Sequence, residues 1–506
     1  MNNCTGANAC NPPVNDIESF QSWSDIDDIR SSLRRSRSFE HVEHDLLDSC
    51  SEVHVDGPAS WDMCSSMYNA PPEENMNDRF KALSVRNNLP DMDNSSNKTE
   101  EKRDIKTELF AKLNNFRHGF ILKTKTQFSY DHPIILLGNL YHRKSSSMPL
   151  TIPHDFRRSL IAEGKLGMEE FKRDIYTRIR FTYRQNMHPL PNSDNLKTDL
   201  GWGCMLRVGQ MMLGFAISQH LLNRSWRLQQ NSCELSTHRS IIELFNDYSE
   251  PLGPLSIHAM IEIARNYGKK AKDWFGPATM ACIIKDCIED MNTNRKKKKC
   301  ILEYSSVNPL SRFCVYIAEN CTVFMKDVEK LAMDGEGNWK SVLILIPVRL
   351  GGEKLNRDYA ECLKGILSFD GCAGVLGGKP RHSVWVCGSQ EDEFIYLDPH
   401  LCQESVNLKD EMTSIETFHC REPRKMSFGK LDPSCTICFI CKSRQHLSEL
   451  RENIQKYCIT KERRNDSTPP MKYPVFSIID KESTPAQALS INRNSRDNHF
   501  EDFVLL

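Results

Sequence analysis

The stretch TDLGWGCMLRVGQMMLGFAI (198–217) places a cysteine, Cys204, at the start of an apolar pattern typical of a helix. Val208, Met212 and Phe215 follow at spacings of four and three, which predicts one buried helix face. A cysteine at a helix start is a candidate nucleophile, because unpaired N–H groups and the helix dipole favour a thiolate there. The alternative is a small buried residue, since free cysteines are often buried.

A thiol nucleophile needs a base to take its proton and a third group to orient that base. His382, in GGKPRHS, precedes Asp398 by 16 residues and would give the order cysteine, histidine, polar orienting residue. His400, in YLDPHLC, lies two residues after Asp398, and residues i and i+2 point the same way in extended backbone. The carboxylate would then fix the imidazole tautomer and favour its charged form. A surface turn also explains Asp-Pro-His, so both histidines remain candidates.

Several segments could position these residues. The spacing in EEFKRDIYTRIRFTYR (169–184) predicts a helix, with Phe171, Ile175 and Ile179 on one stripe. Short runs rich in β-branched residues predict buried strands. These strands are SVLILIPVRL (341–350), SVWVCG (383–388) and the segment DEFIYLDPH, which ends at a proline.

Three closely spaced cysteines, Cys435, Cys438 and Cys441 in SCTICFICK, resemble part of an iron–sulfur ligand run. No fourth cysteine follows nearby, and the intervening Thr, Ile and Phe favour a strand. Residues three apart in a strand point to opposite faces. A buried core strand is therefore predicted here, not a metal site.

The composition restricts the class of protein. Lys and Arg number 66 against 67 Asp and Glu, so binding of nucleic acid through bulk charge is not expected. The N-terminus lacks a secretion signal, and no apolar run is long enough to span a membrane. We therefore expect a cytoplasmic protein with reduced cysteines that is not an integral membrane protein.

Six motifs along the chain are similar to those of the autophagins, the cysteine proteases of the autophagy-related protein 4 family. They are GWGCMLR, RFTYRQN, DWFGPATMA, LGGKP, YLDPH and RKMSFGKLDPSC. The resemblance covers roughly residues 130 to 455 and is strongest to the C/D-type members. It implies an α/β, papain-like fold with a small inserted subdomain. The protease domain as a whole is expected at 106–460. We expect a disordered regulatory tail at 1–105 and a flexible tail at 461–506.

The resemblance also implies an activity. Autophagins cleave after the C-terminal glycine of ubiquitin-like autophagy modifiers, in precursors and in conjugates with phosphatidylethanolamine. Carried over by position, Cys204 is the nucleophile, His400 the base, Asp398 the residue that orients it, and Tyr183 a donor to the oxyanion. No cofactor or metal is implied, and a monomer is expected. The alternatives are a catalytically weak protein that sequesters modifiers, and a deubiquitinase-like thiol protease.

A gate over the active site is also implied by the resemblance. Trp274, in DWFGP, matches a tryptophan packed over the site, and Lys379, Pro380, Arg381 and His382 match a loop that closes against it. This assignment makes His382 part of the gate and not the base. The Arg-His pair departs from the smaller polar residues common in the family.

The C-terminus, HFEDFVLL, contains a second type of motif. Phe503 and Leu506 have the aromatic-x-x-aliphatic spacing of peptides that bind autophagy modifiers by strand addition, and acidic residues precede them. The segment 23–26 (WSDI) has the same spacing. We predict that Phe503 and Leu506 bind the modifier.

Overall fold

The computed structural model describes residues 107–116, 118, 126–141, 167–228, 234–293, 310–379, 382–410, 412–461 and 472–484. The chain divides into two units, 1–95 and 96–506, and every described residue belongs to the second unit. The predicted tail at 1–105 lies outside the described residues.

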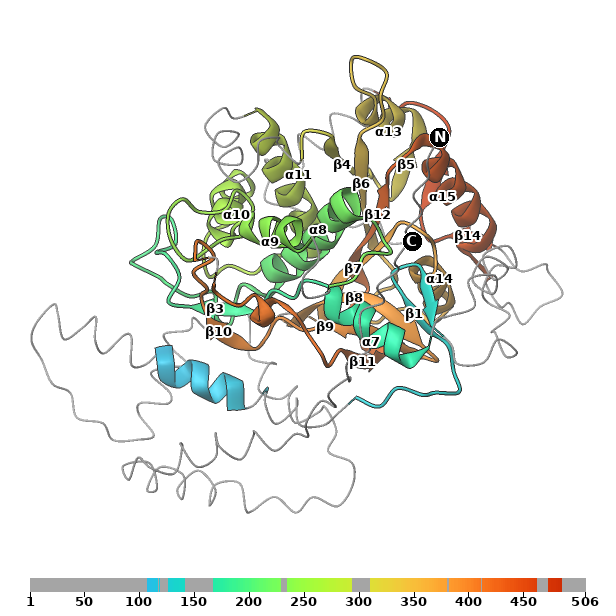
Figure 1. Cartoon of the computed structure of the whole chain (residues 1–506). Helices are drawn as coiled ribbons and strands as arrows, with labels where there is room; N and C mark the ends of the chain where they lie inside the picture. The colour runs from blue at the N-terminus through green and yellow to red at the C-terminus, as the bar shows by residue number, and fades with distance from the viewer. Residues whose placement is uncertain are drawn as a thin grey trace, which may run out of the picture. The chain divides into compact units, whose positions relative to one another are not determined.

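A nine-stranded mixed sheet forms the centre of the described region (Figure 1). Its main path runs β11-β9-β8-β7-β12-β6-β4, and β1 joins β8 while β2 joins β1. Only the β4–β6 pair is parallel within this sheet. The strands are β1 (Ile134–Leu136), β2 (Asn139–Tyr141), β4 (Phe313–Ile317), β6 (Ser341–Arg349), β7 (Cys372–Lys379), β8 (His382–Gln390), β9 (Glu393–Leu397), β11 (Arg424–Ser427) and β12 (Ser434–Cys441). The strands predicted from 341–350, 383–388 and DEFIYLDPH are confirmed as β6, β8 and β9.

One face of the sheet is covered by helices that share a single apolar core. These elements are α7 (Met168–Thr177), α8 (Cys204–Leu222), α9 (Glu234–Glu243), α10 (Ile257–Ala264), η2 (Arg265–Tyr267) and α11 (Pro277–Thr293). The central helix α8 packs on β7 and β8 and is buried on almost every side (Figure 1). A helix that is apolar all round needs such an enclosed position.

A second core fills the other face of the sheet, beneath α13 (Met325–Ala332), α14 (Asp358–Leu367) and α15 (Arg444–Tyr457). Side chains of β8 alternate between the two cores, with Val384 and Val386 in this one and Trp385 and Cys387 in the other. The two 3-10 turns are η3 (Glu416–Phe418) and η4 (Phe428–Lys430).

The three cysteines of SCTICFICK lie in β12, as predicted, and all are fully buried. Cys435 and Cys441 belong to one core and Cys438 to the other. This division follows from the two-residue period of a strand. The segment is a core strand.

The helix predicted over 169–184 is shorter in the structure. Helix α7 ends at Thr177, and Arg178 is already extended. Ile179 pairs with His419, and residues from Tyr183 onward form β3 (Tyr183–Gln185). The aromatic and β-branched residues after 178 favour extended backbone, and pairing with a neighbouring strand overrides the helical spacing.

The segment predicted as a flexible tail after residue 460 is partly ordered. Here β13 (Ile459–Lys461) pairs with β14 (Lys472–Pro474), and β15 (Ser477–Ile479) pairs in parallel with β5 (Thr322–Phe324). Val475 and Phe476 are fully buried. This part of the predicted tail is wrong, because its two apolar side chains complete the second core.

Candidate active site

The start of helix α8 holds Cys204 in place. Gly203 lies directly before it, and a Cβ on that glycine would lie only 2.6 Å from Oδ2 of Asp199. The Asp199 carboxylate accepts hydrogen bonds from Nε of Arg207 and from the backbone N–H of Arg184, both at 2.7 Å. This buried ion pair joins the helix to the chain that leads into β3. The cysteine is thus presented from a rigid turn where only glycine fits.

Asp398 and His400 follow β9 in the Asp-Pro-His turn. The Oδ1 atom of Asp398 accepts hydrogen bonds from the backbone N–H of His400 at 2.8 Å and from its Nδ1 at 2.7 Å. One carboxylate oxygen therefore fixes both the turn and the ring, which leaves Nε2 as the nitrogen available for proton transfer. Burial opposes a charge on His400, but the carboxylate outweighs it and raises the pKa to about 9. The pKa of Asp398 lies well below its usual range for the reciprocal reason.

The thiol of Cys204 lies beside His400 and Ser383. Burial raises its pKa, but the interactions with His400 and with Ser383 outweigh burial, so the pKa lies below that of an ordinary thiol. Its Sγ is 3.6 Å from Oγ of Ser383 on β8. Nε2 of His400 has no well-aligned hydrogen bond within the described residues, as is common in a catalytic pair without substrate. The electrostatics favour a thiolate and an imidazolium.

His382 stacks on His400 with ring centroids 3.9 Å apart and planes 7° from parallel. Burial and the positive charge of His400 hold the pKa of His382 well below its usual value. It is the partner of Lys379 in the β7–β8 hairpin, and the intervening residues Pro380 and Arg381 lie outside the described residues. His382 is therefore a neutral neighbour of His400, although the sequence alone also allowed it as the base.

Possible ligand atoms of His382, Asp398 and His400 lie within 4.8 Å of one another. Nearly parallel stacked rings direct their nitrogen lone pairs along parallel planes, so the two imidazoles do not converge on one ion. The Asp398 oxygen is already engaged with Nδ1 of His400. In this arrangement the cluster suits proton transfer better than metal ligation.

Tyr183 is buried beside the triad. Its ring meets His400 edge to face at 5.5 Å, and its backbone N–H donates to the carbonyl of Pro399. It shares a small apolar cluster with Cys204. The parallel pairing of β3 with β10 (Cys402–Glu404) produces this contact, because Tyr183 is opposite Cys402. The ring of Tyr183, to which the resemblance assigns an oxyanion donor, thus packs against His400.

A helical segment at 107–116 contacts the same loop, which the sequence did not predict. Asn114 donates to the carbonyl of His400 at 2.8 Å, and Asn115 makes hydrogen bonds to both the N–H and the carbonyl of Cys402. Ala111 packs in the cluster of Cys204, and the ring of His118 stacks 5.6 Å from that of His400. Nothing in the residue types marks this segment, because two adjacent asparagines are equally typical of a turn.

The remaining predicted residues are Trp274, Lys379, Phe503 and Leu506. Trp274 precedes α11 and is 49% exposed, with its ring over Gly276. Lys379 ends β7. Phe503 and Leu506 lie outside the described residues.

A cysteine at a helix start, beside an imidazole held by a carboxylate, fits the class of thiol hydrolases. The comparison with known families agrees. Residues 168–453 match the model of the peptidase C54 catalytic domain. The chain belongs to this family and is a cysteine peptidase with a papain-like fold.

The similarity to individual proteins extends beyond the matched domain. The chain is 34% identical to human "Cysteine protease ATG4C" over 462 residues, which are 80% of this chain and 95% of that protein. It is 29% identical to zebrafish "Cysteine protease atg4da" over 491 residues, with 81% and 91% covered. It is 28% identical to "Cysteine protease atg-4.2" of Caenorhabditis elegans over 414 residues, with 75% and 73% covered. None of the described helices combines the length and apolar character needed to cross a bilayer.

Proposed function

We propose that the chain cleaves after the C-terminal glycine of ubiquitin-like autophagy modifiers, both in their precursors and in their conjugates with phosphatidylethanolamine. The observation that carries this proposal is the Asp398–His400 hydrogen bond beside a thiol of lowered pKa, in a chain related to ATG4 proteases. The motif at the start of α8 and the Asp-Pro-His turn are those by which the sequence resembles autophagins.

Cys204, His400 and Asp398 divide the reaction between them. The Cys204 thiolate attacks the glycine carbonyl, and the imidazolium of His400 protonates the departing amine as the carbon–nitrogen bond breaks. The resulting thioester is hydrolysed by a water whose proton His400 accepts. Asp398 keeps Nδ1 of His400 protonated throughout. The proton that His400 gives to the departing amine is thus replaced by the proton that it accepts from water.

The tetrahedral intermediate needs donors for its oxyanion. The hydroxyl of Tyr183 is one proposed donor, since its ring packs edge-on against His400. The backbone N–H of Cys204 is the second, because the first N–H groups of a helix have no acceptor within the helix. A tyrosine held by a strand pair is a fixed donor, which costs no reorganisation during the reaction.

Incubating the full chain with modifier precursors and with lipidated modifiers on vesicles tests the proposal. Cys204→Ala should abolish both cleavages and keep modifier binding. Cys282→Ala removes a buried thiol from α11, far along the chain from the triad, and is the matched control. Cleavage that persists in purified Cys204→Ala protein would assign the nucleophile elsewhere.

The gate and the terminal motif belong to the same proposal. Trp274 and residues 379–382 would close over the substrate glycine, and the exposed ring of Trp274 supports such a role. Phe503 and Leu506 would bind a second site on the modifier. Deleting 501–506 should raise KM and leave kcat unchanged, because this contact is equal in the ground and transition states. A fall in kcat at saturation would argue against a docking motif.

A further inference from the structure

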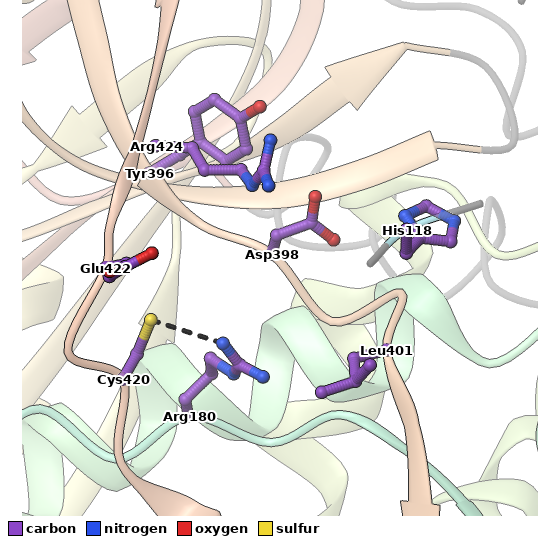
Figure 2. Close-up of a pocket in the computed structure, with 8 residues that line it drawn as sticks. All are labelled: His118, Arg180, Tyr396, Asp398, Leu401, Cys420, Glu422 and Arg424. Atoms are coloured by element: carbon purple, nitrogen blue, oxygen red, sulfur yellow. Dashed lines mark hydrogen bonds between the residues drawn. The ribbon is translucent and has the colours of Figure 1, made fainter. Parts of the chain in front are cut away.

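A pocket lies behind the catalytic carboxylate. Figure 2 shows eight side chains around a narrow hollow that is open to solvent. The lining residues are His118, Arg180, Tyr396, Asp398, Leu401, Cys420, Glu422 and Arg424. Asp398 and Leu401 flank His400 in the chain, so the pocket adjoins the group that protonates the departing amine.

Arg180 presents a buried cation to this pocket. Its side chain is only 8% exposed, yet no carboxylate pairs with it within the described part of the chain. Nη1 donates to the sulfur of Cys420 at 3.2 Å, and Nε is buried without a hydrogen-bond partner. A thiol is a weak acceptor and does not neutralise a guanidinium.

Two other buried arginines of the same region are paired. Arg178 lies 2.8 Å from the Asp174 carboxylate, and Arg207 lies within 2.8 Å of both Asp199 and Asp247. Buried charges in proteins are normally paired in this way, because an isolated ion loses its hydration without compensation. Arg184 is also buried without a carboxylate partner, but its guanidinium donates to the carbonyl of Glu404 and to the hydroxyl of Thr417. Arg180, by contrast, donates from its guanidinium only to a thiol among the described residues, and it faces a solvent-open hollow. An anion that enters the pocket would complete its hydrogen bonding.

A second guanidinium lines the same pocket. Arg424 is half-buried on β11, directly across the strand pair from Tyr396, and its side chain makes no ion pair or hydrogen bond with any residue that the structure describes. Figure 2 shows the Arg424 guanidinium beside the Tyr396 ring. Two planar guanidiniums together offer more donors than one carboxylate can accept. Phosphate, with its several oxygens, matches this donor set.

We propose that this pocket binds a phosphate-class oxyanion between Arg180 and Arg424. The lining also contains the carboxylates of Asp398 and Glu422, so the pocket is bipolar and not simply basic. The free phosphate ion would use the arginines alone.

The phosphate has two sources. One is free phosphate. The other, which rests on the proposed function, is the headgroup of the lipid conjugate, whose phosphorus is four bonds from the amide nitrogen that departs. In that case the pocket would favour the lipid conjugate over a precursor, because the peptide that leaves a precursor carries no phosphate.

Calorimetric titration of the full chain with inorganic phosphate and with phosphoethanolamine tests the pocket itself. Arg424→Gln should weaken binding of both about tenfold, as expected for losing one charge-assisted contact, and Arg424→Lys should recover part of it. Arg421→Gln removes the same charge from an exposed position three residues away and should bind as the parent does. Equal affinity in Arg424→Gln and the parent, or equal loss in Arg421→Gln, would overturn the proposal.

Comparing kcat/KM for a lipid conjugate with kcat/KM for its precursor identifies the source. A fall of about tenfold in this ratio for Arg424→Gln, absent in Arg421→Gln, assigns the headgroup. An unchanged ratio with weakened phosphate binding supports the site but assigns free phosphate. If the parent chain cleaves neither substrate, the proposed function fails, while the titration still decides whether the pocket binds phosphate.

Discussion

Two pairs of stacked histidines in this molecule have opposite electrostatics. In the active site, His400 stacks on His382 and lies 2.7 Å from a carboxylate oxygen. Between α9 and the segment after η3, His238 and His419 face each other with Nε2 atoms 3.3 Å apart and only a backbone carbonyl at Nδ1 of His419. The pKa of His400 rises to about 9, whereas that of His419 falls to about 4.

The difference shows that the partner, and not burial, decides the charge of these rings. Burial lowers the pKa in both pairs, and in the first pair Asp398 reverses it, with smaller contributions from Cys204. In the second pair Nδ1 of His419 donates to the carbonyl of Tyr176, so its Nε2 must accept from Nε2 of His238. Both rings are then neutral, and Nδ1 of His238 has no partner. One pair can exchange protons at neutral pH, and the other is structural.

The largest expected effect comes from removing the Asp398 carboxylate beside His400, which should make the first histidine pair resemble the second. We expect Asp398→Asn to lower kcat by about 10³- to 10⁴-fold, because the imidazolium loses its partner and the tautomer is no longer fixed. Cleavage of a modifier precursor measures it. Asp392→Asn, which changes a side chain 91% exposed, is the control. A loss below tenfold would show that Asp398 does not control His400.

The second pair should instead limit stability in acid. The folded-state pKa of His419 is about 4 against an ordinary 6.5, so the unfolded chain binds more protons between these values. Its contribution to the free energy of unfolding is therefore present above pH 6.5 and is lost as the pH falls toward 4, by about 3 kcal/mol. Denaturant titrations at pH 7 and pH 4.5 should show a smaller pH dependence in His419→Gln than in the parent.

His132→Gln removes an exposed histidine and should keep the parent's pH dependence. If His419→Gln also keeps the full pH dependence, the neutral pair does not contribute to acid sensitivity.

The charge on His400 also predicts an alkaline limit. The reactive pair exists between the lowered pKa of Cys204 and the pKa of about 9 of His400. Hydrolysis should fall about tenfold per pH unit above pH 9 as the imidazolium is lost, whereas alkylation of Cys204 should continue because the thiolate remains. Rates of both reactions between pH 6 and 10.5 measure this. A parallel decline in alkylation would contradict it.

The sequence marks the candidate site residues more directly than it marks their surroundings, for a physical reason. Cys204 and His400 are marked by local features, a helix start and an i, i+2 carboxylate, and their motifs are specific. Helix α7 is shorter than predicted because the residues after it pair with a strand, and the paired residues Tyr183 and Cys402 are 219 positions apart in the chain. The contacts of Asn115 and the unpaired charge of Arg180 likewise arise only when distant segments meet. Spacing carries no signal for such contacts.

The smallest expected effect is that of replacing His382. Comparing this variant with one at His400 tests which of the two histidines is the base, a choice that the sequence left open. Its pKa lies well below the usual value partly because His400 is charged, so His382 is neutral wherever the reactive pair exists. His382→Gln removes a stacked ring, a contact worth about 0.5–1.5 kcal/mol, and should lower kcat/KM by about two- to tenfold. His400→Gln should lower it by several orders of magnitude. Because loss of the neutral ring relieves no charge from His400, the alkaline limit near pH 9 should not move by more than a fraction of a pH unit. Comparable losses in the two variants would identify His382 as the base.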